Sequence, residues 1–417
     1  MTGIAKTRGN AAPGTRGIFR AMGTVPYPDK IPAVQNLRAV SFLAHESVCF
    51  GHGLMTRTLL VLLLASWTAA CNPTGSRSVQ MADLPKAAAL KEQLAFTCAY
   101  EKDKLLPLDP ELDQLFKRAV WIYKQNRLKN DPEEYAKAER LYRIAAAYGH
   151  YKAMNNLGEM LARGQSDADD AVELPFEMTQ DMIRRGIPLG YFNMGILLDT
   201  GYGVKQDEKA ALKYFRKAAD LGNPYAQYLV GNKLTNLTID YPVPYKIGLE
   251  MKRCAADQGH AEAAIDSAYN LQGKAEYSDN PAEATRFYAD AVKYFQIAVK
   301  AGSSQAAYKL QKSFLGPLPD DRLDYLALEK DEERSRRYGV ISKILDGCDY
   351  LGATVDEIDR IVPLPSAKLP PWDGQLEWMQ RWNANVPPRI PDEERIAGLA
   401  KAKGLDPATG RPVQETP

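Results

Sequence analysis

The side chains best suited to catalysis or metal binding are few in this sequence, and they do not cluster. The chain has four histidines and five cysteines among its 417 residues. His150 and His260 each follow a glycine of a recurring phrase, so we interpret both as structural parts of a repeat. Cys98, Cys254 and Cys348 lack the close spacing of a zinc site. The sequence therefore predicts no metal site and no cofactor, and it leaves open whether two of these three cysteines form a disulfide.

The acidic residues give no sign of a catalytic site, and the charge balance gives no sign of nucleic-acid binding. The acidic pairs at 169–170 and 332–333 lie in polar stretches, and no glycine-rich loop follows a strand pattern that could hold a phosphate. Lys and Arg total 53 against 52 Asp and Glu, a formal net charge of +1. Such a balance gives no global field to attract nucleic acid. We expect no catalytic residue, no enzyme activity and no nucleic-acid partner.

One cysteine stands in a context with a specific chemistry. Residues 55–70, MTRTLLVLLLASWTAA, combine a basic start at Arg57, an apolar run from Leu59 to Ala65 and small residues directly before Cys71. This order is typical of an export signal, and the apolar run is shorter than the roughly 20 residues that cross a bilayer. Small residues followed by cysteine resemble the lipobox of bacterial lipoproteins. The resemblance implies a signal peptide at 55–70 and acylation of Cys71; an ordinary soluble secretory signal is the alternative.

The same resemblance implies a destination. Asn72, and not Asp, follows the cysteine, which implies the outer membrane. We therefore expect a periplasmic protein anchored by a lipid on Cys71, with residues 71–108 forming a flexible tether and an N-terminal cap. Residues 1–54 are rich in Gly, Pro, Ala and Arg and lack helical periodicity, so we expect translation to start at Met55. The alternative is that they form a disordered extension.

A short sequence motif recurs along the middle of the chain, and it predicts the helical repeats on which a binding surface would lie. It contains a glycine, as in IAAAYGH (144–150) and KAADLGN (217–223), and returns at intervals of about 40 residues, the size of a helical solenoid unit. A small residue stands nine positions after each of the first four glycines. The marker glycines are Gly149, Gly186, Gly222, Gly259 and Gly302, and the small residues are Gly158, Gly195, Gly231 and Ala268.

The two sets of positions have different structural meanings. A glycine after a helix favours the left-handed conformation that ends it, so each marker glycine is expected to close the second helix, helix B, of a unit. Small residues let helices approach closely, and we expect them where helix A of one unit meets helix B of its neighbour. Small residues also precede most marker glycines by four positions: Ala145, Ala218, Ala255 and Ala298, with Met182 as the exception.

The clearest copy of the unit is YFNMGILLDTGYGVKQDEKAALKYFRKAADLGNPYAQ (191–227). It resembles a Sel1-like repeat, a relative of the tetratricopeptide repeat. The resemblance implies an all-α fold, a right-handed superhelical solenoid of antiparallel helix pairs. We expect the array to span residues 109–315.

A different composition begins after Gly316-Pro317. Residues 316–417 are expected to form a small helical, Pro-rich accessory domain that ends in a loose tail past Asp406. The phrases TVDEIDRIVPLP and LPPWDG resemble an uncharacterised domain that accompanies Sel1-like arrays in proteobacterial lipoproteins, and this resemblance implies no activity. Three tryptophans of this segment either form a binding surface or pack it onto the last repeats. They are Trp372, Trp378 and Trp382.

Protein binding is the expected use of such an array, because surface residues of a solenoid vary without loss of the fold. We expect a monomer that binds through the concave helix-A face of residues 191–271. Tyr202, Tyr228 and Tyr269 are candidate anchors there, or alternatively repeat core. Some lipidated Sel1-like proteins are periplasmic immunity proteins that neutralise lipase effectors of type VI secretion. The resemblance thus implies an immunity or inhibitory protein; the alternative is an envelope scaffold that organises cell-wall or signalling complexes.

Overall fold

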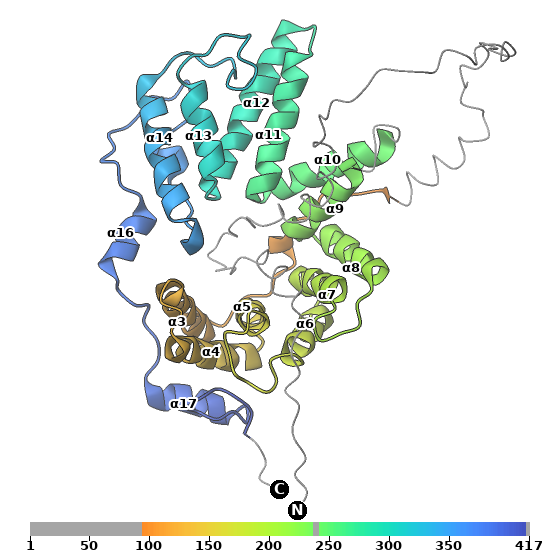
Figure 1. Ribbon diagram of the computed structural model, residues 1–417, viewed down its shortest axis with the longest axis vertical. Helices are drawn as coiled ribbons and strands as arrows, with labels where there is room; N and C mark the ends of the chain where they lie inside the picture. Colours follow the sequence, from red (N-terminus) through yellow and green to blue (C-terminus); the bar gives the residue numbers. More distant parts are fainter. Residues whose placement is uncertain (1–93, 237–241, 414–417) are drawn as a thin grey trace, which may run out of the picture. The chain divides into compact units, whose positions relative to one another are not determined.

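The computed structural model describes residues 94–236 and 242–413 (Figure 1). Within these ranges every regular element is a helix, and the only bridge is an isolated one between Leu405 and Pro412. The all-α prediction is confirmed. The expected signal peptide, Cys71 and the stretch before them lie outside the described residues. Among the described helices, none combines the length and apolar character needed to span a membrane.

The helices follow one another as a series of pairs. Each helix from α3 to α14 packs against the next one along the chain, which makes this part of the molecule a helical solenoid (Figure 1). The helices are η4 (Glu101–Asp103), α3 (Pro110–Asn126), α4 (Pro132–Ala147), α5 (Tyr151–Ala162), α6 (Leu174–Arg184), α7 (Pro188–Thr200), α8 (Glu208–Asp220), α9 (Pro224–Asn236), α10 (Pro242–Asp257), α11 (Ala261–Glu276), α12 (Pro281–Lys300), α13 (Ser304–Ser313), α14 (Glu332–Gly347), η5 (Asp349–Leu351), α15 (Ile358–Ile361), α16 (Glu377–Ala384) and α17 (Glu393–Lys401).

The marker glycines close the second helix of each pair, as the sequence predicts. All five have positive φ angles, from +72° at Gly186 to +104° at Gly222. At Gly149 the glycine N–H bonds to Ala146 O and the next N–H bonds to Ala145 O, the two bonds of a Schellman motif. The same pair of bonds recurs at the other four marker glycines. The small residue four positions earlier therefore supplies a carbonyl that the turn requires.

The residue after the marker glycine begins the next helix. His150 Nδ1 accepts a hydrogen bond from Ala153 N at 3.1 Å, and His260 Nδ1 accepts one from Ala263 N at 3.3 Å. Asn223 and Ser303 cap α9 and α13 in the same way. A cap of this kind satisfies an N–H that the first turn of a helix leaves unpaired. The interpretation of both histidines as structural parts of the repeat is confirmed.

The small residues of helix A lie at close contacts, but within a pair and not between neighbouring pairs. A Cβ at Gly195 of α7 would lie 2.5 Å from the ring of Phe215 in α8, and one at Gly231 of α9 would lie 2.9 Å from Gly248 O in α10. Ala268 is fully buried, whereas Gly158 has ordinary space around it. For Gly195 and Gly231 the expectation that these residues join neighbouring units is wrong, because both lie against the helix B that follows them in the same pair.

The pairing of helices continues past residue 315, into α13 and α14. Gln311 stands in α13 where earlier units have a small residue, and the small residue is on the opposite helix instead. A Cβ at Gly339 of α14 would lie 2.8 Å from the Gln311 side-chain nitrogen. Ser335 Oγ of α14 donates to Gln311 O at 2.9 Å. The exchange of large and small residues between the two helices preserves the close contact.

Two arginines of α14 hold the Pro-rich segment that follows it. Arg334 Nε donates to Pro363 O at 3.1 Å, and the Arg337 guanidinium donates to Ile361 O at 2.6 Å and to Pro370 O at 2.7 Å. These carbonyls belong to a stretch with few regular elements, whose backbone groups need partners from elsewhere. The arginines supply them.

The C-terminal segment returns to the first helix pair. Ile396 and Leu399 of α17 are buried in the same hydrophobic core as the side chains of α3, α4 and α5. Arg411 donates to the Glu139 carboxylate of α4 at 3.2 Å. The prediction of a loose tail past Asp406 is wrong through residue 413, because this stretch bonds to α4 and forms a bridge with Leu405, which follows α17.

Candidate partner-binding surfaces

The three tyrosines expected as anchors lie in very different surroundings. Tyr228 is 8% exposed, and its ring centroid lies 4.6 Å from that of His260. It is repeat core, so its assignment as a partner-binding residue is wrong. Tyr202 is half-buried, and its hydroxyl donates to Ala171 O at 2.9 Å. Tyr269 of α11 is 38% exposed and remains available to a partner.

Tyr269 lies at the edge of a cavity between α9, α10 and α11. The cavity has a volume of about 380 Å³. Lys252 and Asp266 lie in its wall and form an ion pair at 2.9 Å. Its lining residues are Thr235, Tyr245, Leu249, Lys252, Arg253, Asp266, Ser267, Tyr269 and Asn270. Tyrosine rings beside a paired charge suit a partner side chain that has both apolar and polar parts.

The surface continues from this cavity onto α13. The Lys309 ammonium lies 5.8 Å from the centroid of the Tyr269 ring and also donates to Leu323 O. Burial lowers the pKa of Lys309. Tyr308 is 52% exposed and Leu323 is 71% exposed. We call the cavity together with Tyr245, Tyr269, Tyr308 and Leu323 the tyrosine surface.

The three tryptophans of the C-terminal segment are half-buried. The Trp372 indole N–H donates to Gln375 O at 2.9 Å, and its ring lies 5.7 Å from the guanidinium carbon of Arg337. The Trp378 indole N–H is buried without an acceptor among the described residues. Trp382 lies on the same short helix, α16. For Trp372 these contacts support packing onto α14; for Trp378 and Trp382 a partner role stays a prediction.

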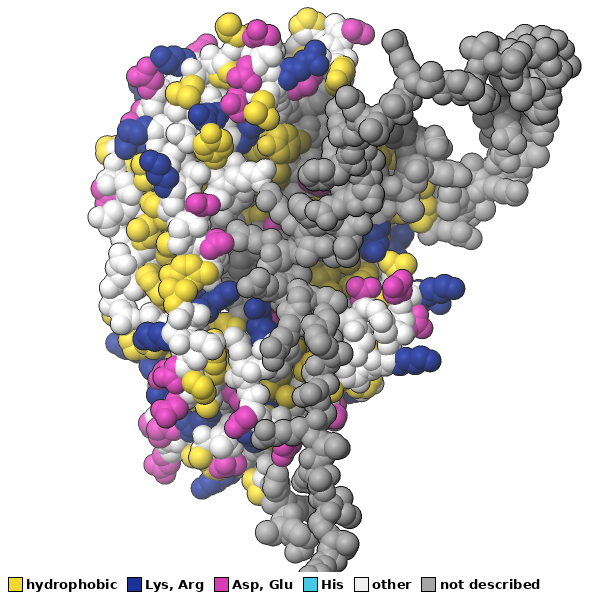
Figure 2. All heavy atoms as spheres, viewed as in Figure 1, with side chains coloured by type: hydrophobic (Ala, Val, Ile, Leu, Met, Phe, Trp, Pro, Cys, Tyr) yellow, Lys and Arg dark blue, Asp and Glu magenta, His cyan; other side chains and the backbone are white. Residues whose placement is uncertain are grey.

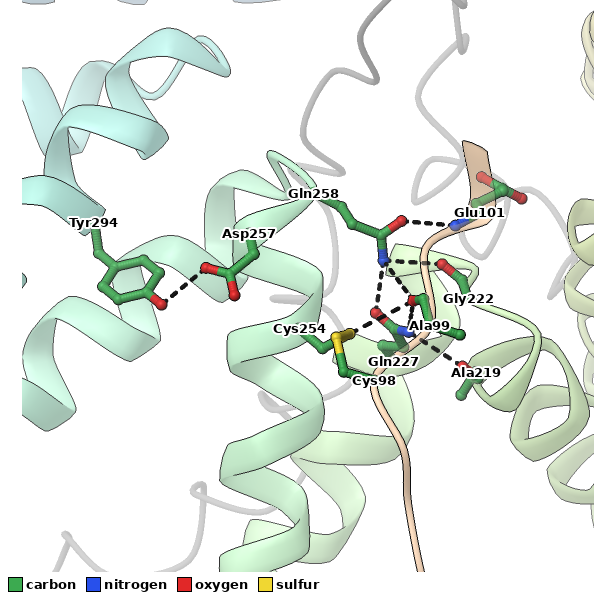
Figure 3. The surroundings of a disulfide bond; sticks show 10 residues. All are labelled: Cys98, Ala99, Glu101, Ala219, Gly222, Gln227, Cys254, Asp257, Gln258 and Tyr294. Carbon is green, nitrogen blue, oxygen red and sulfur yellow. Dashed lines mark hydrogen bonds between the residues drawn. A yellow bond between two sulfur atoms is a disulfide. The ribbon is translucent and has the colours of Figure 1, made fainter. Parts of the chain in front are cut away.

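The segment before α3 crosses the array and is bound to it covalently. Cys98 and Cys254 form a disulfide across 156 residues of sequence, and Cys348 is free (Figure 3). Ala99 O accepts a hydrogen bond from Gln227 Nε2 at 2.9 Å. Glu101 N donates to Gln258 Oε1, also at 2.9 Å. Residues 96–104, here called the strap, thus lie against α8, α9 and α10.

Two buried titratable groups stand beside this region. His260 Nε2 and Glu262 Oε2 are buried and find no hydrogen-bond partner in the described part of the chain. Burial lowers the pKa of His260 to about 3 and raises the pKa of Glu262 to about 7. The equivalent His150 has a partner, since its Nε2 lies 3.4 Å from Asp113 Oδ1. That contact lowers the pKa of Asp113 to about 2.

The described surface has no field of one sign on the face shown in Figure 2, where basic and acidic side chains are interspersed. No group of three or more His, Cys, Asp or Glu side chains among the described residues is placed to hold a metal ion.

The repeated turn, with its marker glycine and its close Gly195–Phe215 contact, identifies the unit. A family model for the Sel1 repeat matches residues 152–174 and 188–223. These residues are similar to Sel1 repeats. A second model, described as a domain of unknown function (DUF6396), matches residues 306–413. The Sel1 match covers all of α7 and α8 and all of α5 except its first residue, and the second match begins inside α13.

Several solved structures are similar to the Sel1 array. Immunity protein PA5088 from Pseudomonas aeruginosa is 27% identical, with 65% of this chain and 94% of that chain covered and a TM-score of 0.48. Immunity protein Pa5087 from the same organism is also 27% identical, with 65% and 95% covered and a TM-score of 0.46. A Sel1 repeat protein from Oxalobacter formigenes is 20% identical, with 54% and 96% covered and a TM-score of 0.34. All three TM-scores lie below 0.5. Among curated proteins, none matches this sequence.

Sequence reasoning did not predict the strap, and of the residues that define the tyrosine surface it named only Tyr269. Tyr308 stands six positions after Gly302, as Tyr228 does after Gly222, so the repeat alone could have suggested it. The repeat could not have shown that one of these tyrosines is buried and the other exposed. That difference depends on His260, which covers Tyr228.

Proposed function

We propose that this Sel1-repeat chain is a protein-binding protein of the bacterial envelope that neutralises a secreted toxic effector, as an immunity protein does. The tyrosine surface carries the proposal. Exposed tyrosines around a cavity are the kind of anchor that contributes most of the binding energy in protein interfaces. A solenoid offers such a surface without strain, because each helix pair is supported by its neighbours. The type VI lipase effectors are the proposed targets.

The proposed location is the periplasm, with a lipid on Cys71 as the anchor to the outer membrane. Residues 55–70 support it, because they have the basic start, the apolar run and the final small residues of an export signal. The Cys98–Cys254 disulfide supports it as well, because disulfides persist in oxidising compartments such as the periplasm and are rare in the cytosol.

The test begins with the chain from Asn72 onward, purified from the periplasm of its native host, and with identification of what co-purifies. We expect one stoichiometric secreted effector, bound with a Kd of about 1 nM. Deletion of the gene should make the cells sensitive to that effector. Several cell-wall or membrane proteins bound at about micromolar Kd, with no effector among them, would instead support the scaffold.

The tyrosine surface is then tested by substitution. Tyr269→Ala should weaken effector binding by at least about tenfold, as expected of a central aromatic anchor. Leu128→Ala is the matched control, because Leu128 is 74% exposed in the turn between α3 and α4. Equal affinities of the two variants, with unchanged helix content, would exclude the tyrosine surface as the binding site.

A further inference from the structure

The strap is extended through Tyr100 and enters η4 at Glu101, and the groove that it occupies bonds to the extended part of its backbone. Two buried amides, Gln227 and Asn223, bond to it. Gln258 bonds to it as well, and Figure 3 shows Gln227 and Gln258 beside the strap. Gln258 uses both ends of its amide: Oε1 accepts from Glu101 N at 2.9 Å and Nε2 lies 3.4 Å from Ala99 O. A side-chain amide placed in this way pairs with the N–H and the C=O of an extended chain, much as a neighbouring strand would.

The groove also recognises a side chain of the strap. Asn223 Nδ2 donates to Glu101 Oε1 at 2.9 Å, and Glu101 is only 3% exposed. Gly222 makes room for the backbone, because a Cβ there would lie 2.6 Å from Glu101 N. Hydrogen bonds to a charged carboxylate are among the stronger polar contacts in proteins. The groove thus holds a side-chain oxygen of the strap at this position.

The fold of the repeat does not require these amides. The positions equivalent to Gln258 and Gln227 in the other units carry no amide. Directly before the other marker glycines stand Tyr148, Arg185, Leu221 and Ala301, and five residues after them stand Met154, Tyr191, Ala264 and Ala307. Since the turns form equally well with those residues, the turn itself does not need the two glutamines. They bond to the strap and also to the array, where Gln258 Nε2 donates to Gly222 O at 2.9 Å and Gln227 Nε2 to Ala219 O at 3.2 Å.

A second turn of the array receives an extended segment in the same way. A Cβ at Gly302 would lie 2.2 Å from Ala353 O, and Val355 N donates to Lys300 O at 2.9 Å. The marker-glycine edge therefore takes chain segments at two separate units. By contrast, the turn at Gly259 has open space where its Cβ would stand.

We propose that the groove formed by Gly222, Asn223, Gln227 and Gln258 is a peptide-binding site for an extended segment with a glutamate. The chain's own residues 99–101 fill the groove, and the Cys98–Cys254 disulfide retains them there. A free peptide of this chemistry takes the place of the strap once a dithiol has reduced the Cys98–Cys254 bond to two thiols and has itself become a disulfide. This site is separate from the tyrosine surface, so it stands or falls independently of the immunity function.

The test captures a peptide at Cys254 in the full chain. Cys98→Ser combined with Glu101→Ala removes the covalent bond and the buried carboxylate of the strap, and leaves the Cys254 thiol. The probe is the peptide of residues 96–104, FTCAYEKDK, as a mixed disulfide with glutathione. The Cys254 thiolate attacks the cysteine sulfur of the peptide, a new S–S bond forms, and glutathione leaves as a thiolate that takes a proton from water. Mass spectrometry of the fragment that contains Cys254 measures the product.

The control peptide has alanine at the position of Glu101. We expect the native peptide to be captured at about tenfold lower concentration than the control, as the loss of a hydrogen bond to a charged group implies. Asn223→Ser in the same chain keeps a side-chain oxygen that can cap α9, as Ser303 caps α13, but removes the N–H that donates to Glu101 Oε1. This variant should abolish the preference. Equal capture of both peptides, a preference that survives Asn223→Ser, or no capture by a chain of normal helix content would each overturn the proposal.

A second measurement keeps the disulfide intact and avoids a folding failure. In the otherwise native chain, Glu101→Ala should speed reduction of the Cys98–Cys254 bond by dithiothreitol about tenfold, since the groove then holds the strap less firmly. Asp103→Ala is the control, because Asp103 is exposed at the end of the strap. Equal reduction rates for the two variants would show that the groove contributes nothing beyond the disulfide.

Discussion

The two segments that flank the array are attached to it by different chemistry. The N-terminal strap crosses α8, α9 and α10 and is held by one disulfide and by buried amides. The C-terminal helix α17 packs on the first helix pair through buried apolar side chains, with ion pairs such as Arg395–Glu111 at 2.7 Å around them. Each attachment joins residues more than 100 positions apart. The strap depends on a covalent bond and on buried polar groups, whereas α17 depends on apolar burial.

The disulfide should make the largest difference between the two attachments. Cys98→Ser removes a bond that closes a loop of 156 residues, and the entropy of such a loop corresponds to about 5 kcal/mol of unfolding free energy. Chemical denaturation followed by circular dichroism measures the loss. Cys348→Ser is the matched control, because Cys348 is free, and it should change stability by less than about 0.5 kcal/mol. A loss below about 1 kcal/mol for Cys98→Ser would show that the amides alone hold the strap.

The apolar attachment predicts the next largest effect. Ile396 of α17 is fully buried in the core of the first helix pairs, and Ile396→Ala should cost about 2–4 kcal/mol. Val386→Ala serves as control, since Val386 is 73% exposed and should matter little. Hydrogen exchange of the α3 and α4 amides should increase in the first variant alone. If exchange there were unchanged, α17 would be an accessory to the first pair and not part of its core.

Sequence reasoning recovered what is local and missed what is long-range. The marker turns could be predicted because a helix C-terminus needs a left-handed glycine within a few residues of the carbonyls that it satisfies, as at Gly149. The burial of Tyr228 could not, because it depends on a ring contributed by the next unit. The sequence alone does not show which of the three cysteines pair, and it does not predict that α17 packs on the first helix pair. Both depend on contacts between segments that no periodicity relates.

The carboxyl groups beside the two capping histidines, His260 and His150, also differ between the two regions. Beside the strap, Glu262 Oε2 lies 3.5 Å from His260 Nδ1. Burial raises the pKa of Glu262 to about 7, and the negative charge of Asp266 contributes to this rise. Near α17, Asp113 pairs with His150 and with Lys117, and its pKa falls to about 2. The first carboxyl therefore favours its protonated form in the folded chain, and the second favours its ionised form.

These opposite shifts predict opposite pH dependences, which are the smallest of the expected effects. A carboxyl with a raised pKa binds a proton more tightly when folded, so the unfolding free energy should fall as pH rises from about 4.5 to about 7. Glu262→Gln should remove that fall and stabilise the chain at pH 8 by about 2 kcal/mol, reduced because a quarter of the side chain remains exposed. Asp113 should contribute stability above pH 3.8, and this contribution should be lost as pH falls toward 2. Glu283→Gln is the matched control, because the Glu283 side chain is exposed in the first turn of α12, and it should leave the slope between pH 4.5 and 7 unchanged. An unchanged slope in Glu262→Gln would mean that water reaches this carboxylate, and the contrast between the two histidine turns would then lie in geometry alone.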